Sequence, residues 1–346
     1  MERWFNEKGG DTSHVVYSRA RLVRNWSEYP FPSKMTREQS AQMTKSLLEG
    51  LKDIGSVDGR TYRFLYLNQL SELERAALLE RRVLNRSAVK QEMPSGLILS
   101  EDERVSIVIN SDDHIRIRVL EPGLAIEKCY ELANRIDDFI GERFSYSFDE
   151  KYGYLTSFPT NVGTGLRASA VLHLPVLSGK KNFSSLVADM GRFGTLVRGV
   201  YGEGGENFGS LYQVSNQRTL GQPEPELVSL AEKAAAELGA QEQRLRREIL
   251  RQRKLARMDE VYKSYGVLKY ARKLTRKDGM EFLSQLMAGE ADGILKFQEP
   301  CSIYGLMLGI QPANLLQAAG RPLNKEELDG ARAEFLRERL PELASV

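Results

Sequence analysis

Short segments with two kinds of apolar period fill the first two thirds of the chain. Alternation of apolar and polar residues predicts strands, whereas apolar spacings of three and four predict helices. The predicted strands are residues 15–22, 104–110, 114–120, 152–156 and 166–174, and the predicted helices are residues 36–53, 71–86 and 129–143. Because strands follow one another without a regular strand–helix–strand order, the pattern favours an α+β fold with a mainly antiparallel sheet.

The last third of the chain has a different character. Residues 226–346 are rich in Ala, Leu, Glu and Arg and follow a helical period. Just before them, residues 221–225 contain two prolines separated by one residue, a pattern that discourages helix. The sequence therefore predicts two domains, residues 1–225 and an all-helical C-terminal domain of residues 226–346.

Composition narrows the class of protein. The chain has 346 residues, of which 41% are hydrophobic and 28% charged, as in soluble globular proteins. Its 49 Lys+Arg against 47 Asp+Glu give a net charge of +2, so bulk charge does not indicate nucleic-acid binding. No apolar run is long enough to span a membrane, and no apolar signal region opens the chain. Two distant cysteines indicate neither a disulfide framework nor a metal site, so we expect a cytoplasmic protein.

Arginines recur where strand side chains share a face or where glycine-rich stretches adjoin a strand. They are Arg19, Arg21, Arg116, Arg118, Arg167 and Arg198. A guanidinium group is always charged, and its planar fork suits phosphate oxygens. The chain has neither a Walker A sequence nor the protein-kinase motifs, so a phosphate site here would have to be built from arginine side chains. For any single pair, a solvated strand face with salt bridges remains the alternative.

Carboxylates accompany these arginines. Asp112 and Asp113 lie in the turn between two predicted strands, and Glu203 and Glu206 lie in a glycine-rich stretch. A carboxylate beside arginines stays ionised and could hold a cationic substrate or accept its proton. Judged on spacing alone, turn caps and surface charges are the favoured interpretations.

Four segments carry a resemblance to a known family, the phosphagen (guanidino) kinases. They are residues 18–25, 110–116, 159–169 and 198–206, which occur in the family's order. The absence of a helical domain before the first motif, and the helical tail after the last, are more similar to the bacterial protein-arginine kinases. The resemblance continues through residues 264–268 and 326–333, so it covers nearly the whole chain.

The resemblance implies a curved antiparallel sheet flanked by helices and transfer of the ATP γ-phosphoryl group to arginine side chains in proteins. Mg²⁺ would be bound through the nucleotide, without a protein metal site. Asp112 and Glu206 occupy the family's two carboxylate positions, which align the guanidinium and accept its proton. By the family pattern the nucleotide site comprises Ser18, Arg19, Ala20, Arg21, Leu22, Arg116, Arg167, Ala168, Ser169, Ala170, Val171, Arg198, Gly199, Val200, Tyr201, Gly202 and Glu203.

The C-terminal segment resembles the family's phosphoarginine-binding pocket, a docking and allosteric site. Asp329 and Arg332 are retained there, while Leu328 replaces an arginine. The resemblance also implies a homodimer and three partners: a zinc-containing activator protein, a stress-response repressor and the Clp unfoldase–protease.

Several positions depart from the family pattern. Asp112 stands where the family has Glu, Ser111 replaces an acidic residue, and Phe158 replaces a cysteine that lies beside the substrate guanidinium. A nucleotide-adjacent histidine has no counterpart around residues 84–90. Three interpretations stay open. The first is an active protein-arginine kinase, and the second is a weakly active or inactive homologue that binds phosphoarginine proteins or scaffolds a partner. The third is a kinase of small guanidino compounds.

Overall fold

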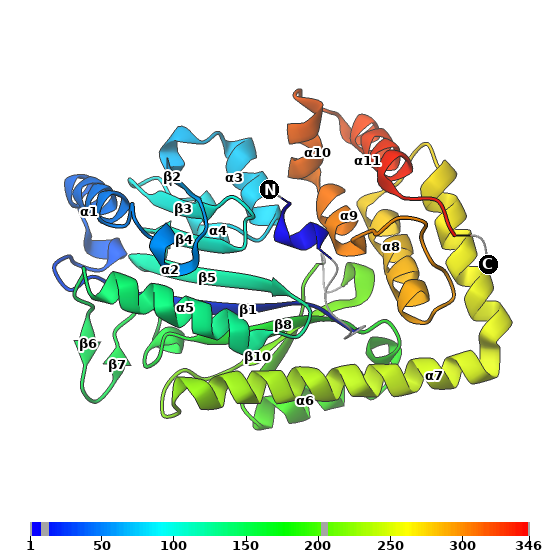
Figure 1. Ribbon diagram of the computed structural model, residues 1–346, viewed down its shortest axis with the longest axis horizontal. Coiled ribbons are helices and arrows are strands. Elements are labelled where there is room, and N and C mark those ends of the chain that lie inside the picture. Colours follow the sequence, from blue (N-terminus) through cyan, green and yellow to red (C-terminus); the bar gives the residue numbers. More distant parts are fainter. Residues whose placement is uncertain (1, 8–13, 202–206, 345–346) are drawn as a thin grey trace.

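The computed structural model describes residues 2–7, 14–201 and 207–344, and an eight-stranded sheet organises most of them (Figure 1). The strand order is β2-β3-β4-β5-β1-β8-β10-β9, and every neighbouring pair is antiparallel. The strands are β1 (Val15–Arg24), β2 (Tyr62–Tyr66), β3 (Gly96–Ser100), β4 (Val105–Ile109), β5 (Ile115–Pro122), β8 (Arg167–His173), β9 (Thr195–Gly199) and β10 (Leu211–Asn216). A separate hairpin of β6 (Phe148–Asp149) and β7 (Gly153–Tyr154) projects from the body of the molecule.

Helices cover both faces of the sheet and form the C-terminal part. They are α1 (Arg37–Gly50), α2 (Gly55–Asp58), α3 (Glu72–Glu80), α4 (Arg86–Val89), α5 (Ile126–Gly141), α6 (Phe183–Arg192), α7 (Glu224–Tyr270), α8 (Arg276–Ala291), α9 (Ile303–Gly309), α10 (Pro312–Ala319) and α11 (Lys325–Arg339). The predicted α+β class and helical C-terminal part are confirmed. Among the described residues, none of these helices combines the length and the apolar character needed to cross a membrane.

Side-chain alternation on β1 separates two environments. Ala20 and Leu22 are fully buried in the core formed with α1, α5 and the beginning of α7. Arg19 and Arg21 point to the opposite face, as the alternation predicts. A register shift near the start of β1 brings Val15 into the same core as Ala20. One face of the sheet is therefore an ordinary apolar core, and the other carries charge.

Local signals explain the ends of the helices. Thr36 caps α1 through a capping box with Gln39, which fixes the helix start where the sequence indicates it. The predicted helix 71–86 is wrong in its second half, because α3 ends at Glu80 and Arg82 adopts a positive φ of 71°. The predicted strand 152–156 is reduced to the two residues of β7.

The 47-residue helix α7 joins the sheet to the C-terminal part. It begins at Glu224, because Pro225 falls in the first turn, where a missing N–H costs nothing. The prolines therefore mark the start of a helix. Leu227 and other residues of its first half belong to the core of the sheet, whereas Leu268 and its neighbours pack with the C-terminal helices. At Arg253 the backbone leaves helical geometry, with φ −139° and ψ 39°.

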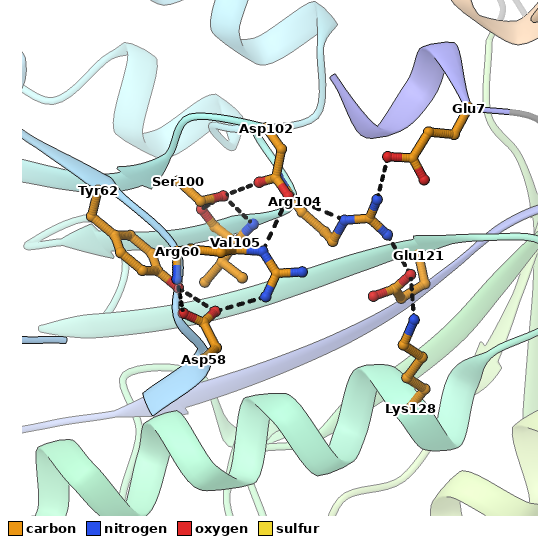
Figure 2. Close-up of polar contacts among 10 residues, drawn as sticks. All are labelled: Glu7, Asp58, Arg60, Tyr62, Ser100, Asp102, Arg104, Val105, Glu121 and Lys128. Atoms are coloured by element: carbon orange, nitrogen blue, oxygen red, sulfur yellow. Dashed lines mark hydrogen bonds and ion pairs between the residues drawn. The ribbon is translucent and has the colours of Figure 1, made fainter. Parts of the chain in front are cut away.

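A network of ion pairs attaches the N-terminal segment to the sheet (Figure 2). The guanidinium of Arg104 contacts Glu7 at 2.6 Å and Asp102 at 3.3 Å, and it also pairs with Glu121. Arg60 reaches Asp102 at 3.1 Å from the other side. Since these charges are mutually satisfied, the network stabilises the position of the segment that precedes β1.

Candidate active site

Three arginines form a row across the centre of the charged sheet face. Arg21 on β1 lies directly opposite Arg118 on β5 and directly opposite Arg167 on β8. Residues directly opposite in antiparallel pairs share a face, with Cβ atoms roughly 5 Å apart. We call these three residues the arginine row. Like charges at this spacing repel one another, so the arrangement is costly unless an anion joins it.

Neutral partners hold the arginines in position. Arg21 Nη2 donates to Asn161 Oδ1 at 2.7 Å, and Arg167 Nη1 donates to the carbonyl oxygen of Asn216 at 2.7 Å. Arg19, one step along β1, donates to Ser169 Oγ at 3.2 Å. Within the described part of the chain, no carboxylate forms an ion pair with Arg19 or with a member of the row.

The electrostatics indicate an incomplete site. Burial lowers the pKa of Arg21 well below its ordinary value, and the charges of Arg116, Arg167 and Arg19 lower it further. Burial likewise lowers the pKa of Arg118, with Arg19 and Arg116 adding to the effect. The Nε atoms of Arg21 and Arg116 are buried donors without a partner among the described residues. The phosphates of a nucleotide would supply both the acceptors and the negative charge that this face lacks, so the residues fit ATP.

Two arginines of this region were not among the predicted site residues. The guanidinium of Arg82 lies 4.4 Å from the ring centroid of Tyr201, and its Nε and Nη2 atoms are buried without a partner. Arg118 Nη2 donates to the carbonyl oxygen of Val83 at 2.6 Å and so holds the turn that carries Arg82. Arg118 is among the arginines that the sequence pattern singles out, but it is not in the nucleotide site that the family resemblance implies. Arg82 could not have been found from the sequence, because its place depends on where α3 ends.

Some residues predicted for the nucleotide site have side chains that face away from the row. Ser18 donates to the carbonyl oxygen of Gly123 at 2.8 Å, on the side of α5. The other such side chains are buried in the apolar core, namely Ala20, Leu22, Ala168 and Ala170. Val171 is buried on the arginine side, against the C-terminal helices. Apart from Val171, these side chains lie on the opposite face of the sheet from the arginine row.

The predicted nucleotide segment of residues 198–203 is described only in part. Arg198 and Gly199 end β9 at the edge of the sheet and are exposed. Val200 packs near the C-terminal helices, and the ring of Tyr201 contacts the guanidinium of Arg82. Gly202, Glu203 and the second predicted carboxylate, Glu206, lie outside the described residues.

The turn between β4 and β5 presents one carboxylate to the arginines. Asp112 Oδ2 lies 2.5 Å from Arg116 Nη2 and accepts from Asn85 Nδ2 at 2.9 Å. Asp113 is fully buried and accepts from Asn25 Nδ2 at 2.9 Å and from the backbone N–H of Ser157 at 2.7 Å. Asp112 is therefore available to chemistry, and Asp113 fixes the turn.

His114, two residues before Arg116 on the same alternation, is a structural residue. Its Nδ1 accepts from the N–H of Trp26 at 3.0 Å, and its Nε2 lies 2.9 Å from the carbonyl oxygen of Pro30. Burial lowers the pKa of His114 to about 4, so the ring is neutral at pH 7. The arginine face thus has no titratable group from His114.

The two residues predicted to bind phosphoarginine contact each other. Arg332 Nη1 lies 2.6 Å from Asp329 Oδ1 and donates to the carbonyl oxygen of Leu274 at 2.7 Å. Arg332 Nε donates to the carbonyl oxygen of Ile310 at 3.1 Å. With only 1% of its surface exposed, Arg332 joins α11 to the segments around α8 and α9.

Two family models match this chain side by side. Residues 42–245 match the ATP:guanido phosphotransferase C-terminal catalytic domain, and residues 252–346 match the protein-arginine kinase McsB C-terminal domain. The antiparallel sheet with its arginine row agrees with the first, and the helical part with the second. Fold and site together define an ATP:guanido phosphotransferase.

Curated relatives narrow the class. The chain is 37% identical to a protein-arginine kinase of Desulforamulus reducens, and the match covers 99% of this chain and 96% of that protein. It is 36% identical to that of Bacillus subtilis, over 98% and 93% of the two chains, and 34% identical to that of Halothermothrix orenii, over 98% and 97%. This chain belongs to the protein-arginine kinases.

Solved structures agree with the fold. A crystal structure of lombricine kinase superposes with a TM-score of 0.58 at 24% identity, covering 67% of each chain. The duplicated taurocyamine kinase from Schistosoma mansoni with bound transition state analog components gives a TM-score of 0.58 at 26% identity. That match covers 66% of this chain and 33% of the other.

Proposed function

We propose that the arginine row, with Arg19 and Arg116, binds the phosphates of ATP, and that Asp112 directs γ-phosphoryl transfer to an arginine side chain of a protein. The observation that carries the proposal is the arginine row together with Arg19, buried or half-buried on one sheet face, with which no carboxylate forms an ion pair within the described residues. Arg116 beside them pairs with Asp112. Membership in the protein-arginine kinases supports the same reaction.

The chemistry requires charge neutralisation and positioning. Phosphoryl transfer places negative charge on the oxygens around phosphorus, and fixed arginines stabilise that charge without reorganisation. Mg²⁺ bound through the nucleotide would supply further neutralisation. Because Asn161 and the backbone carbonyls of Asn216 and Val83 accept hydrogen bonds from the row, its residues are preorganised for this role.

The carboxylate of Asp112 acts on the other substrate. A protonated guanidinium is a poor nucleophile, so a carboxylate must align it and accept a proton as the nitrogen attacks. Arg116 and Asn85 both contact Oδ2 of Asp112, and no hydrogen bond occupies Oδ1 within the described residues. We assign Oδ1 to the substrate guanidinium and Glu206 to the second carboxylate position.

The helical part supplies regulation in this proposal. Asp329 and Arg332 would receive phosphoarginine, with Leu328 in place of the family's first arginine. We further propose a cytoplasmic homodimer that is switched by a zinc-containing activator, acts on a stress-response repressor and marks proteins for the Clp unfoldase–protease. These assignments rest on the resemblance of the whole chain to its family.

We also propose that the boundary between the two parts lies within α7 and not at residue 225. The first half of α7 packs in the core of the sheet, and the bend occurs at Arg253. The two family models stop at residue 245 and start again at residue 252, which supports the same position.

A second candidate function follows from the altered guanidinium side of the site. Asp112 is one methylene shorter than glutamate and is already paired with Arg116, and Phe158 has neither charge nor hydrogen-bonding capacity. A protein with these residues could bind phosphoarginine proteins through its helical part while turning over slowly. This candidate predicts binding without phosphorylation.

Incubation with Mg-ATP and casein, followed by mass spectrometry at neutral pH, distinguishes the kinase from the phosphoarginine-binding protein. The proposal predicts phosphoarginine that the Asp112→Asn variant fails to form. Asp189→Asn is the matched control, because Asp189 is exposed on α6 and pairs with Arg192 on the same helix. No phosphoarginine from the parent protein, despite ATP binding and an added activator, would favour the second candidate.

A further inference from the structure

Four exposed apolar side chains lie on segments that hydrogen bonds connect, directly or through one another, to the turn that carries Asp112. They are Phe148, Tyr152, Phe158 and Leu220, whose exposed fractions lie between 46% and 58%. We call this set the apolar rim. Exposed large apolar side chains that gather in one region mark interaction surfaces, whereas single ones need no explanation.

Hydrogen bonds join the three segments that carry the rim. Tyr154 N donates to the carbonyl oxygen of Gly163 at 2.8 Å, which ties the β6–β7 hairpin to the loop that begins at Phe158. Thr164 N donates to the carbonyl oxygen of Thr219 at 2.8 Å, which ties the same loop to the segment of Leu220. The loop also approaches Leu220 closely, since a Cβ added at Gly163 would lie 2.9 Å from its Cα. The three segments that carry the rim are therefore held next to one another.

The same segments are fixed to the catalytic groups. Ser157, directly before Phe158, donates its N–H to Asp113 in the turn that carries Asp112. Asn161, three residues after Phe158, accepts from Arg21 of the arginine row. A chain whose arginine reaches Asp112 would therefore lie close to the segments that carry the rim.

We infer that the apolar rim binds the polypeptide on either side of the target arginine, through apolar side chains close to that arginine. A free guanidino compound would have no use for such a surface, but a polypeptide substrate would bury it. Phe158 would face the guanidinium itself, where an aromatic ring attracts a cation. This inference rests on the proposed function, because it concerns the substrate of the same site.

The test compares two peptides with one arginine each, one with leucines beside the arginine and one with serines. We expect the parent protein to show a lower KM for the leucine peptide. The Phe148→Ser/Tyr152→Ser variant should raise that KM about tenfold while kcat stays within about twofold, since only uniform binding is lost. The serine peptide should be phosphorylated equally by both proteins, which also reports that the variant is folded.

Phe193→Ser is the matched control, because Phe193 is 77% exposed at the end of α6 and belongs to none of the rim segments. Equal KM values of the parent for both peptides would overturn the inference and leave the proposed function intact. Phosphorylation of neither peptide would refute the proposed function itself. A variant that turns from dimer to monomer in sedimentation would assign the rim to a contact between copies and would also overturn the inference.

Discussion

Replacing Arg21 by Gln tests whether the arginine row is built for a ligand or for the fold. Arg21 is the middle residue of the row, so it faces two like charges at once, Arg118 and Arg167. At a separation of ~7 Å and an effective dielectric constant of ~20, each pair repels by about 2.4 kcal/mol. The hydrogen bond to Asn161 that the substitution weakens is worth about 1 kcal/mol.

Because repulsion exceeds the lost hydrogen bond, we expect the ligand-free Arg21→Gln protein to be at least as stable as the parent. Guanidinium groups splay apart and water screens them, so we place the gain in the free energy of unfolding at about 1 kcal/mol. If Arg21 served only to stabilise the fold, its replacement would lower the free energy of unfolding.

In contrast to its effect on the free protein, the Arg21→Gln substitution should weaken nucleotide binding. Mg-ADP at one hundred times its Kd stabilises the parent by about 2.7 kcal/mol. Loss of one charge-assisted contact weakens binding about 10- to 100-fold, which reduces the stabilisation at the same concentration to between about 1.4 and 0.4 kcal/mol. Urea unfolding with and without Mg-ADP measures both quantities, with Arg192→Gln, an exposed arginine on α6, as the control. A loss of more than 2 kcal/mol in the free protein, with the nucleotide effect unchanged, would refute the reasoning.

Three further predictions concern single residues. Asp112→Asn should lower kcat at least about 10²-fold with a small change in the KM for ATP, and Asp112→Glu should retain activity, as coupled measurement of ADP release will show. Arg332→Ala should lower the free energy of unfolding by about 3–5 kcal/mol, because it leaves Asp329 and two carbonyl groups buried without their partner. In the same urea experiment, replacing the exposed Arg339 by Ala should change it by less than about 0.5 kcal/mol. As the pH falls from 6.5 to about 4, the free energy of unfolding should decrease by about 3 kcal/mol through His114. Because the pKa of His114 is lowered in the folded protein, the unfolded chain takes up the proton first, and the contribution is fully present only above pH 6.5. Urea unfolding at several pH values should show a flatter pH profile for a His114→Gln variant.

The sequence predicted those features that depend on neighbours along the chain. The alternation around Arg19 and Arg21, the cap at Thr36 and the turn at Asp112 are all local, and the structure has them where expected. The arginine row is different, because it depends on the register of β1 against β5 and β8. Those strands are about 100 and 150 residues away, and no local pattern specifies which residues face each other.

The same limit explains the errors. The helical period continues past Glu80, yet the chain turns at Arg82 because that turn brings its side chain to the sheet. The domain boundary at residue 225 stays a prediction, but the helix that starts there contributes Leu227 to the core of the sheet. In both places tertiary packing overrides a local signal.

The break in helical geometry at Arg253 divides α7 into two helical segments, so a change in the angle between them would grow with distance along the second segment. About 17 residues of helix follow the bend, a length of ~25 Å at 1.5 Å per residue. A change of ~10° at that one position would therefore move the far end, at Tyr270, by ~4 Å. Since the C-terminal helices pack on this arm, such a rotation would shift the helical part relative to the arginine row, and the contacts of α10 with α3 and of the C-terminal helices with Val171 would have to change with it.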